Sequence, residues 1–330
     1  MSLLSVRDLR VGFDTMSGRV EAVRGISYDV ERGKILGIVG ESGSGKTVSA
    51  LSVLRLLPPN GKILDGSITF DGTDLVQASE RQLREVRGGR IGMVFQDPTT
   101  ALNPVVRIGR QIDEAVLLHN RKLTRREIRR RTLDTLELVG VPDPARRAEQ
   151  YPHQWSGGMR QRAVIAIALA NDPELVIADE PTTALDATVQ AQVLRVLTDA
   201  REARGCAVVL ITHDLGVISD VADDVVVMYA GQVAEACPAP TLFDASRHPY
   251  PLALMRSRPG WASAAGTTRL VPIPGRPPDL AAPLPGCPFQ PRCDWAGDDP
   301  ACVTVNPPLI SLTERHRTAC HHHDQLGVRA

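Results

Sequence analysis

The stretch KILGIVGESGSGKT, residues 34–47, joins a short buried-strand pattern to a glycine-rich loop. The loop fits G-x-x-x-x-G-K-[ST], and apolar residues follow at helical spacing from Thr47 to Leu57, where Pro58 stops the helix. Between a strand and a helix, such glycines let backbone N–H groups wrap phosphate oxygens at the positive end of the helix dipole. We therefore predict a phosphate-binding loop made of Gly40, Ser42, Gly43, Ser44, Gly45, Lys46 and Thr47.

Within this loop, Lys46 is expected to reach the β- and γ-phosphates, and the Thr47 hydroxyl to ligate Mg²⁺. A second stretch, LVIADE at residues 175–180, is an apolar strand that ends in two carboxylates. Asp179 is predicted to hold Mg²⁺, and Glu180 to accept a proton from an attacking water. Together the two stretches indicate a nucleotide-hydrolysing site.

Strand-like and helix-like stretches alternate over the first 240 or so residues, which predicts an α/β domain with a mainly parallel sheet. Residues 98–162 are almost purely helical in pattern, which indicates an inserted helical subdomain. Beyond about residue 241 prolines multiply and periodicity fades. We expect a domain at 1–245 and a loop-rich extension at 246–330.

Charge and hydropathy narrow the function class. The chain carries 38 basic and 38 acidic residues, so no net field attracts it to nucleic acid. Arg7, Asp8 and Arg10 interrupt the N-terminus too early for a signal peptide, and no apolar run approaches the roughly 18–20 residues of a membrane span. These features favour the reducing cytosol, where clustered cysteines bind metal more often than they pair.

Four of the six cysteines lie in the extension, at spacing C-x₅-C-x₈-C-x₁₇-C: Cys287, Cys293, Cys302 and Cys320. The spacing lacks the C-x₂-C pairs of common zinc modules, so tetrahedral Zn²⁺, one iron–sulfur cubane and free or paired thiols all stay open. His321–His323 are expected to be a solvated polar tail. Cys206 and Cys237 are expected to be small apolar core residues.

The stretch WSGGMRQR, residues 155–162, precedes LVIADE, and PTTALD, residues 181–186, follows it. This order resembles the ATP-binding-cassette (ABC) ATPases, whose signature usually reads LSGGQ. Here Trp155 and Met159 depart from that pattern, while Ser156, Gly157 and Gly158 keep it. The resemblance implies a P-loop ABC ATPase domain with an antiparallel β subdomain and an inserted helical subdomain.

The resemblance also implies further roles around ATP and Mg²⁺. Ser156, Gly157 and Gly158 would contact the ATP of an opposing subunit. Gln96 would approach Mg²⁺ as the Q-loop glutamine, and Asp186 would be the D-loop aspartate. His213 would contact the γ-phosphate, and Phe13 would stack on adenine.

Longer phrases, FQDPTTALNP at 95–104 and PLPGCPFQPRC at 283–293 with His248-Pro249-Tyr250 before it, resemble the ATPase subunits of oligopeptide/dipeptide and nickel importers. That resemblance implies ATP hydrolysis coupled to import, and a [4Fe–4S] cluster on the four cysteines. It implies as partners a second, related ATPase in a heterodimer, two membrane permeases and an extracytoplasmic binding protein. The chain would lie peripherally on the cytoplasmic side of the membrane. Import of nickel or another solute, and a soluble ABC ATPase without a transport role, are the alternatives.

Overall fold

The computed structural model describes residues 2–16, 18–182, 186–257 and 271–326. The chain divides into two compact units. Unit 1 comprises residues 1–3, 30–35 and 77–211, and unit 2 comprises residues 4–29, 36–76 and 212–330. The chain thus passes between the units several times, so neither is a continuous segment.

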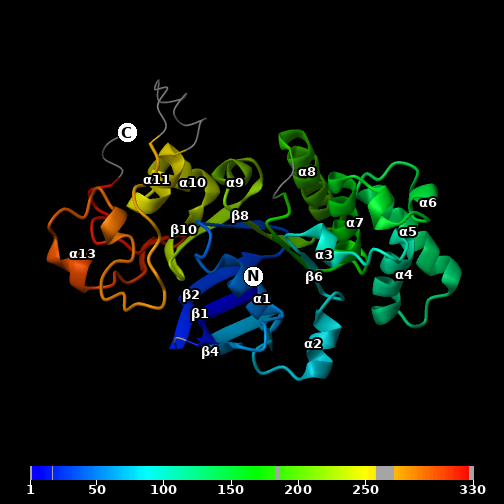
Figure 1. The fold of residues 1–330 in the computed structure, drawn as a ribbon, viewed down its shortest axis with the longest axis horizontal. Coiled ribbons are helices and arrows are strands. Elements are labelled where there is room, and N and C mark those ends of the chain that lie inside the picture. The colour runs from blue at the N-terminus through cyan, green and yellow to red at the C-terminus, as the bar shows by residue number, and fades with distance from the viewer. Residues whose placement is uncertain (1, 17, 183–185, 258–270, 327–330) are drawn as a thin grey trace. The chain divides into compact units, whose positions relative to one another are not determined.

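Unit 2 contains an antiparallel sheet with strand order β2-β1-β4-β5. Its strands are β1 (Ser2–Thr15), β2 (Gly18–Glu31), β4 (Gly61–Phe70) and β5 (Thr73–Asp74), and helix α1 (Lys46–Val53) lies beside them (Figure 1). The Tyr28 hydroxyl of β2 and Ser49 Oγ of α1 are 3.3 Å apart in the interior. Burial raises the pKa of Tyr28 to about 12, so this phenol stays neutral at physiological pH.

The remaining strands of unit 2 run in the order β11-β12-β10-β9-β3. They are β3 (Ile35–Val39), β9 (Asp224–Tyr229), β10 (Gln232–Pro238), β11 (Ile310–Thr313) and β12 (His316–Thr318). Strand β3 pairs with β9 in parallel, and the other pairs are antiparallel. The other helices of unit 2 are α9 (Leu215–Val221), α10 (Ala239–Ala245), α11 (Pro249–Arg256), the 3₁₀ turn η2 (Gln290–Arg292) and α13 (Pro300–Thr304).

Unit 1 is built on the parallel strands β6 (Ile91–Val94), β7 (Leu175–Asp179) and β8 (Ala207–Thr212), with β7 in the centre. All residues of β7 and β8 are buried, as expected for parallel strands covered on both faces. Its helices are α2 (Glu80–Val86), α3 (Pro98–Ala101), α4 (Ile108–His119), α5 (Arg125–Leu138), α6 (Pro144–Arg147), the 3₁₀ turn η1 (Pro152–Gln154), α7 (Gly157–Leu169) and α8 (Ala187–Arg204). Helices α4, α5 and α6 form one group in Figure 1.

Local chemistry explains where the elements differ from the sequence pattern. Helix α1 ends at Val53, four residues before the predicted Leu57. Within the predicted helical subdomain a separate helix, α5, begins at Arg125, because Thr124 and Glu127 form a reciprocal capping box. The described part of the extension contains two short strands, two α-helices and one 3₁₀ turn, so it is more regular than its proline content predicts.

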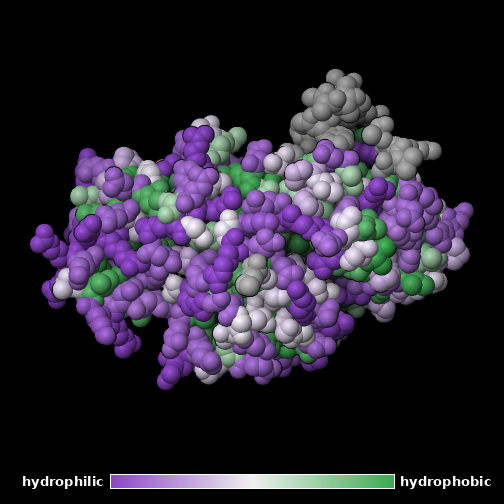
Figure 2. All heavy atoms as spheres, turned by 180° about the vertical axis from the view of Figure 1, so that it is seen from behind, coloured by the Kyte–Doolittle hydropathy of each residue, from purple (hydrophilic) through white to green (hydrophobic). Residues whose placement is uncertain are grey.

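The hydrophobic areas on the face seen in Figure 2 are small and are separated by hydrophilic side chains. Among the helices of the described residues, none combines the length and the apolar character needed to cross a bilayer.

Candidate functional site

The phosphate loop joins β3 to α1 in unit 2, as predicted. Two of its glycines are required by close backbone contacts. A Cβ on Gly40 would lie 2.1 Å from the Met228 carbonyl oxygen, and a Cβ on Gly45 would lie 2.5 Å from the Ala22 carbonyl oxygen. Both glycines also have positive φ, +153° and +96°, a conformation that L-residues rarely adopt. The loop backbone is therefore held close to its neighbouring strands.

Lys46 is 4% exposed and lies back over the loop that precedes it. Its Nζ donates to the Gly40 carbonyl oxygen at 2.8 Å and to the Glu41 carbonyl oxygen at 3.0 Å. Ser44 Oγ is buried and makes no hydrogen bond to any described residue. A buried hydroxyl of this kind is a donor that an anionic ligand could satisfy. The loop thus places a cation and a hydroxyl at the positive end of α1.

In unit 1, Asp179 ends β7 and is 4% exposed, and Glu180 follows it with φ +46°. The Gln96 side chain, two residues after β6, donates from Nε2 to Glu180 Oε2 at 3.2 Å. Parallel strands β6 and β7 are adjacent, so their carboxyl ends bring Gln96 and Glu180 together. The structure therefore unites two predicted catalytic residues that are 84 positions apart in sequence.

The signature segment begins helix α7. Ser156 is the N-cap, and its Oγ accepts a hydrogen bond from the Met159 backbone N–H. A Cβ on Gly158 would lie 2.4 Å from Val189 Cγ1 of α8, so glycine is required for α7 and α8 to pack. Trp155 stands where the signature usually has leucine, and it is 3% exposed. The position is buried, so a tryptophan can replace the leucine as a large apolar side chain. Ser156 and Gly157 are exposed.

The other predicted site residues have local roles that the structure makes visible. Asp186 is the N-cap of α8 and accepts from the Val189 N–H at 3.0 Å. Residues 183–185 of the PTTALD stretch lie outside the described residues. His213 is exposed directly after β8 and belongs to unit 2, as does Phe13, which is half-buried in β1 opposite Gly61.

The four extension cysteines are gathered in unit 2 as free thiols. The Cys287 N–H donates to the Cys302 carbonyl oxygen at 2.9 Å. Burial, with the nearby Cys293 and Cys302 thiols, raises the pKa of Cys287 to about 11. Burial and the other three thiols raise the pKa of Cys320 to about 12. Side chains 33 positions apart in sequence therefore share one electrostatic environment.

His322 does not behave as part of a solvated tail. Its Nε2 lies 3.5 Å from Cys302 Sγ and 3.2 Å from Asp299 Oδ2, and its side chain is 17% exposed. The histidine therefore lies against one of the four cysteines. Cys206 and Cys237 are buried in the core, as expected.

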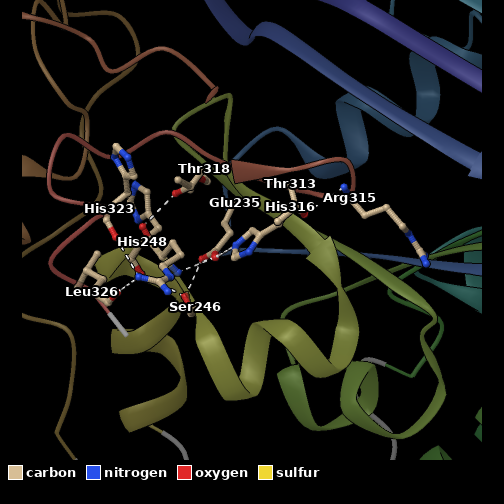
Figure 3. A network of polar contacts seen from close by, with 11 residues as sticks. Glu235, Ser246, His248, Thr313, Arg315, His316, Thr318, His323 and Leu326 are labelled. Atoms are coloured by element: carbon tan, nitrogen blue, oxygen red, sulfur yellow. Dashed lines mark hydrogen bonds and ion pairs between the residues drawn. The ribbon is translucent and has the colours of Figure 1, made fainter. Parts of the chain in front are cut away.

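A buried carboxylate anchors the extension. Glu235 of β10 is fully buried, and it accepts from Ser246 Oγ at 2.6 Å and from the Arg247 N–H at 2.7 Å. His316 Nε2 of β12 lies 2.7 Å from the same carboxylate, and Figure 3 shows Glu235 between Ser246 and His316. Because Ser246 and Arg247 are adjacent and His316 lies about 70 positions later in β12, this network fastens the final strands to the rest of unit 2.

Three residues to which the sequence analysis gave no role are Glu41, Tyr250 and Arg292. They join the extension to the phosphate loop inside unit 2. The sequence contained a signal for each of them. Glu41 is a charged residue inside a glycine-rich loop, and Tyr250 and Arg292 lie within the stretches that carry the family resemblance.

Comparison with known proteins defines the class first. The fold matches the solved ATP-binding cassette MJ0796, bound to ADP and Pi, with a TM-score of 0.64 and 26% identity over 72% of this chain and 98% of that one. Cassette cbiO1 from Clostridium perfringens matches with a TM-score of 0.64 and 27% identity over 73% of this chain and 90% of that one. Residues 23–183 match the ABC transporter family model, and residues 234–302 match the oligopeptide/dipeptide transporter C-terminal region. The protein is an ABC ATPase cassette with that extension.

Full-length relatives narrow the family. The dipeptide transport ATP-binding protein DppD of Bacillus subtilis is 47% identical over 99% of this chain and 97% of its own length. DppD of Escherichia coli is 45% identical over 98% and 97%. The oligopeptide transport ATP-binding protein OppD of Mycobacterium tuberculosis is 50% identical over 96% of this chain, which spans about half (51%) of that relative's length. The chain belongs to the family of oligopeptide and dipeptide transport ATP-binding proteins.

Proposed function

We propose that this chain is the ATP-binding and ATP-hydrolysing subunit of an ABC transporter that imports dipeptides or oligopeptides. It would act peripherally on the cytoplasmic side of the membrane. The observation that carries the proposal is the similarity to DppD of Bacillus subtilis over 99% of the chain. The match of residues 234–302 to the C-terminal region of peptide transporters supports the same class of cargo.

The proposed chemistry assigns the main motifs of the cassette a role in phosphoryl transfer. Lys46 and His213 stabilise charge on the transferred phosphate, and Glu180 orients and deprotonates the attacking water. Bound Mg²⁺ would neutralise phosphate charge, with Thr47, Gln96 and Asp179 as the residues that hold it. The buried Asp179 carboxylate at a strand end and the hydroxyl of Thr47 are oxygen donors of the kind that Mg²⁺ prefers.

The remaining motifs contact the rest of the nucleotide and the opposing subunit. Phe13 stacks on adenine, and the segment Ser156–Gly158 with Asp186 faces the ATP of a second ATPase subunit. A chain with one phosphate loop and one signature needs such a partner to complete its sites. A related chain, giving a heterodimer, is favoured over a second copy.

The permease partners are proposed to dock on unit 1. A cavity of about 970 Å³ there is lined by residues that include Val105, Arg107, Asp113, Leu117 and Tyr151. Val105 is 79% exposed and Leu117 is 44% exposed, so apolar surface accompanies the charged groups. This mixture of apolar and charged groups suits the docking of a short permease segment. The proposed transporter has two permease subunits, and an extracytoplasmic binding protein delivers substrate to them.

The cysteine segment is proposed to hold a [4Fe–4S] cluster through Cys287, Cys293, Cys302 and Cys320. Four gathered thiols are the donor set that such a cluster uses. Four thiolates could also hold tetrahedral zinc, and the metal content of the purified protein distinguishes the two. The cluster would supply positive charge that keeps the thiols ionised and would staple the extension.

Transport in reconstituted vesicles tests the main proposal. The chain, its partner ATPase and the permeases are placed in vesicles with the binding protein, and uptake of a labelled dipeptide is followed with and without ATP. We expect uptake that requires ATP and stops with Glu180→Gln. ATP hydrolysis without peptide uptake, when nickel or another solute is taken up instead, would contradict the peptide assignment.

Metal analysis of anaerobically purified protein tests the cluster separately. We expect about four iron atoms and about four acid-labile sulfides per chain, with absorption at roughly 400 nm. Zinc at about one per chain would refute the cluster and leave the ATPase proposal intact.

A further inference from the structure

Glu41 is the second residue of the phosphate loop, and each of its polar groups has a partner. Its backbone N–H donates to the Tyr250 hydroxyl at 2.8 Å, and its carbonyl oxygen accepts from Lys46 Nζ at 3.0 Å. Arg292 grips its carboxylate with two nitrogens, Nη1 to Oε2 at 2.5 Å and Nη2 to Oε1 at 3.0 Å. The loop is thus held at one residue by two side chains that come from the extension.

Arg292 is also held in place by residues other than Glu41. Its side chain is 4% exposed, its Nε donates to the Pro274 carbonyl oxygen at 2.8 Å, and its Nη1 lies 3.2 Å from the Tyr229 hydroxyl. Hydrogen bonds to Glu41 raise the pKa of Arg292, so the guanidinium stays charged throughout the accessible pH range. Arg292 is buried, it contacts the carboxylate with two nitrogens, and each of its three guanidinium nitrogens has a hydrogen-bond partner. It is therefore a rigid support rather than a surface ion pair.

An aromatic cluster supports the same contacts. The rings of Tyr229 and Tyr250 lie 4.5 Å apart, and Phe289 lies 5.3 Å from each. Phe289 precedes the turn η2, and Arg292 ends it, directly before Cys293. The position of the guanidinium therefore depends on how the segment from Cys287 to Cys293 is folded.

Charge explains why the loop needs this support. Glu41 places a carboxylate in a loop that must receive a polyphosphate, and like charges at close range repel. The bidentate contact neutralises that carboxylate and turns it toward the extension. Without Arg292 the partly buried carboxylate would be left uncompensated, and it could move toward the phosphates or toward Lys46.

We propose that Arg292, assisted by Tyr250, is a positioning residue that holds the phosphate loop through Glu41, so that the cysteine segment sets the affinity for ATP. The inference rests on the proposed binding of ATP at residues 40–47. It assigns the extension a part in the nucleotide site, through contacts made within one chain.

The test compares nucleotide affinity in full-length variants. Dissociation constants for a non-hydrolysable ATP analogue with Mg²⁺ are measured for the wild-type chain, Arg292→Ala and Arg292→Lys. We expect Arg292→Ala to weaken binding roughly tenfold, within the usual range of coupling between sites. Arg292→Lys should fall between, because an ammonium keeps the charge but not the two-pronged contact. Arg315→Ala is the matched control, since Arg315 is an extension arginine with an exposed ion pair to Asp224 and should leave affinity unchanged.

Two further readouts separate positioning from a general loss of structure. In the assembled ATPase, Arg292→Ala should raise KM for ATP with little change in kcat, because Arg292 does not touch the transferred phosphate. In a Glu41→Gln background, Arg292→Ala should lose most of its effect, since the carboxylate that it neutralises is gone.

The outcomes are distinguishable. Wild-type affinity in Arg292→Ala at an unchanged unfolding temperature would overturn the inference alone, as would an equal effect of that substitution with and without Glu41→Gln. If Arg292→Ala does not fold, wild-type affinity in a folded Arg292→Lys variant would overturn it equally. Failure of the wild-type chain to bind the analogue would instead overturn the proposed function, and this inference with it.

Discussion

At the scale of single residues, Glu180 combines a catalytic type of side chain with an uncommon backbone. Its φ of +46° is unusual for a non-glycine residue and costs on the order of 1 kcal/mol or more. The surrounding structure maintains it, because the Glu180 N–H donates to the Ile211 carbonyl oxygen at 2.9 Å and the side chain accepts from Gln96. Backbone strain at a carboxylate residue that follows a buried strand is typical of a functional site. There the orientation of the side chain matters more than the stability that the strain costs.

We expect Glu180→Gln to lower ATP hydrolysis by at least about 100-fold while ATP binding is retained, because the amide keeps the shape but cannot accept a proton. Phosphate release by the assembled ATPase measures the first effect, and equilibrium dialysis measures the second. Glu202→Gln, an exposed change on α8, serves as the control. Hydrolysis at the wild-type rate in Glu180→Gln would remove Glu180 from the role of base.

His248 provides a residue-scale prediction about pH. Burial lowers its pKa to about 3, and its Nδ1 accepts from the Tyr250 N–H as the cap of α11. The unfolded chain protonates this histidine below pH 6.5, whereas the folded chain does not, so stability falls as pH drops from 6.5 toward 3. The free energy of unfolding should be about 2 kcal/mol lower at pH 5 than at pH 7 from this residue alone.

The measurement is denaturant unfolding at pH 5 and pH 7 for the wild-type chain and for His248→Asn. Asparagine can still cap α11 but does not titrate, so the variant should lose this part of the acid sensitivity. An identical pH dependence in both proteins would show that His248 is not the group responsible.

At the scale of elements, the sequence predicts the parts whose signals are local. Strand β3, the loop and the start of α1 follow from one contiguous pattern. The exact end of α1 does not, because Pro58 limits the helix without fixing its last turn. Strands β11 and β12 have only four and three residues. Strand β12 is positioned by pairing with β10, some 80 positions earlier, and β11 by pairing with β12. Such pairing leaves no periodic signal in the sequence.

The Glu235 network makes the docking of those strands testable. Glu235→Ala would leave the Ser246 hydroxyl, the Arg247 N–H and His316 without their shared acceptor in the interior. We expect a loss of about 3–5 kcal/mol in the free energy of unfolding, as for other broken buried networks. Limited proteolysis should then cut the extension first.

Glu314→Ala provides the control, because Glu314 is an exposed glutamate between the same two strands. Equal stability of the Glu235 and Glu314 variants would mean that backbone pairing alone holds the extension.

At the scale of the whole molecule, motifs in the sequence are enough to propose the residues of the candidate site, but not the contacts among them. Ordered motifs indicated Lys46, Glu180 and Gln96, and the structure adds that Gln96 and Glu180 share a hydrogen bond. The link between Arg292 and Glu41 could not be predicted, because 251 positions separate two residues with no common motif. The Arg292–Glu41 ion pair forms only when unit 2 is completely folded. The conformation of the phosphate loop, by contrast, is encoded in one short contiguous stretch of sequence.

The proposed assembly gives the prediction at this scale. Val105 is 79% exposed and lines the cavity of unit 1, so Val105→Glu should place an unpaired charge against a docked permease. We expect co-purification with the permeases and peptide-stimulated ATP hydrolysis to fall roughly tenfold or more, the effect of one unfavourable charge in an interface core.

Binding of ATP by the isolated chain should not change, since Val105 is not a nucleotide-site residue. Val303→Glu, at an apolar residue of α13 that is 50% exposed, should leave assembly intact. If both variants assemble and are stimulated like the wild type, the cavity is not where the permeases dock. If both fail, charge on the surface rather than the position of Val105 is responsible, and the docking surface must be sought elsewhere.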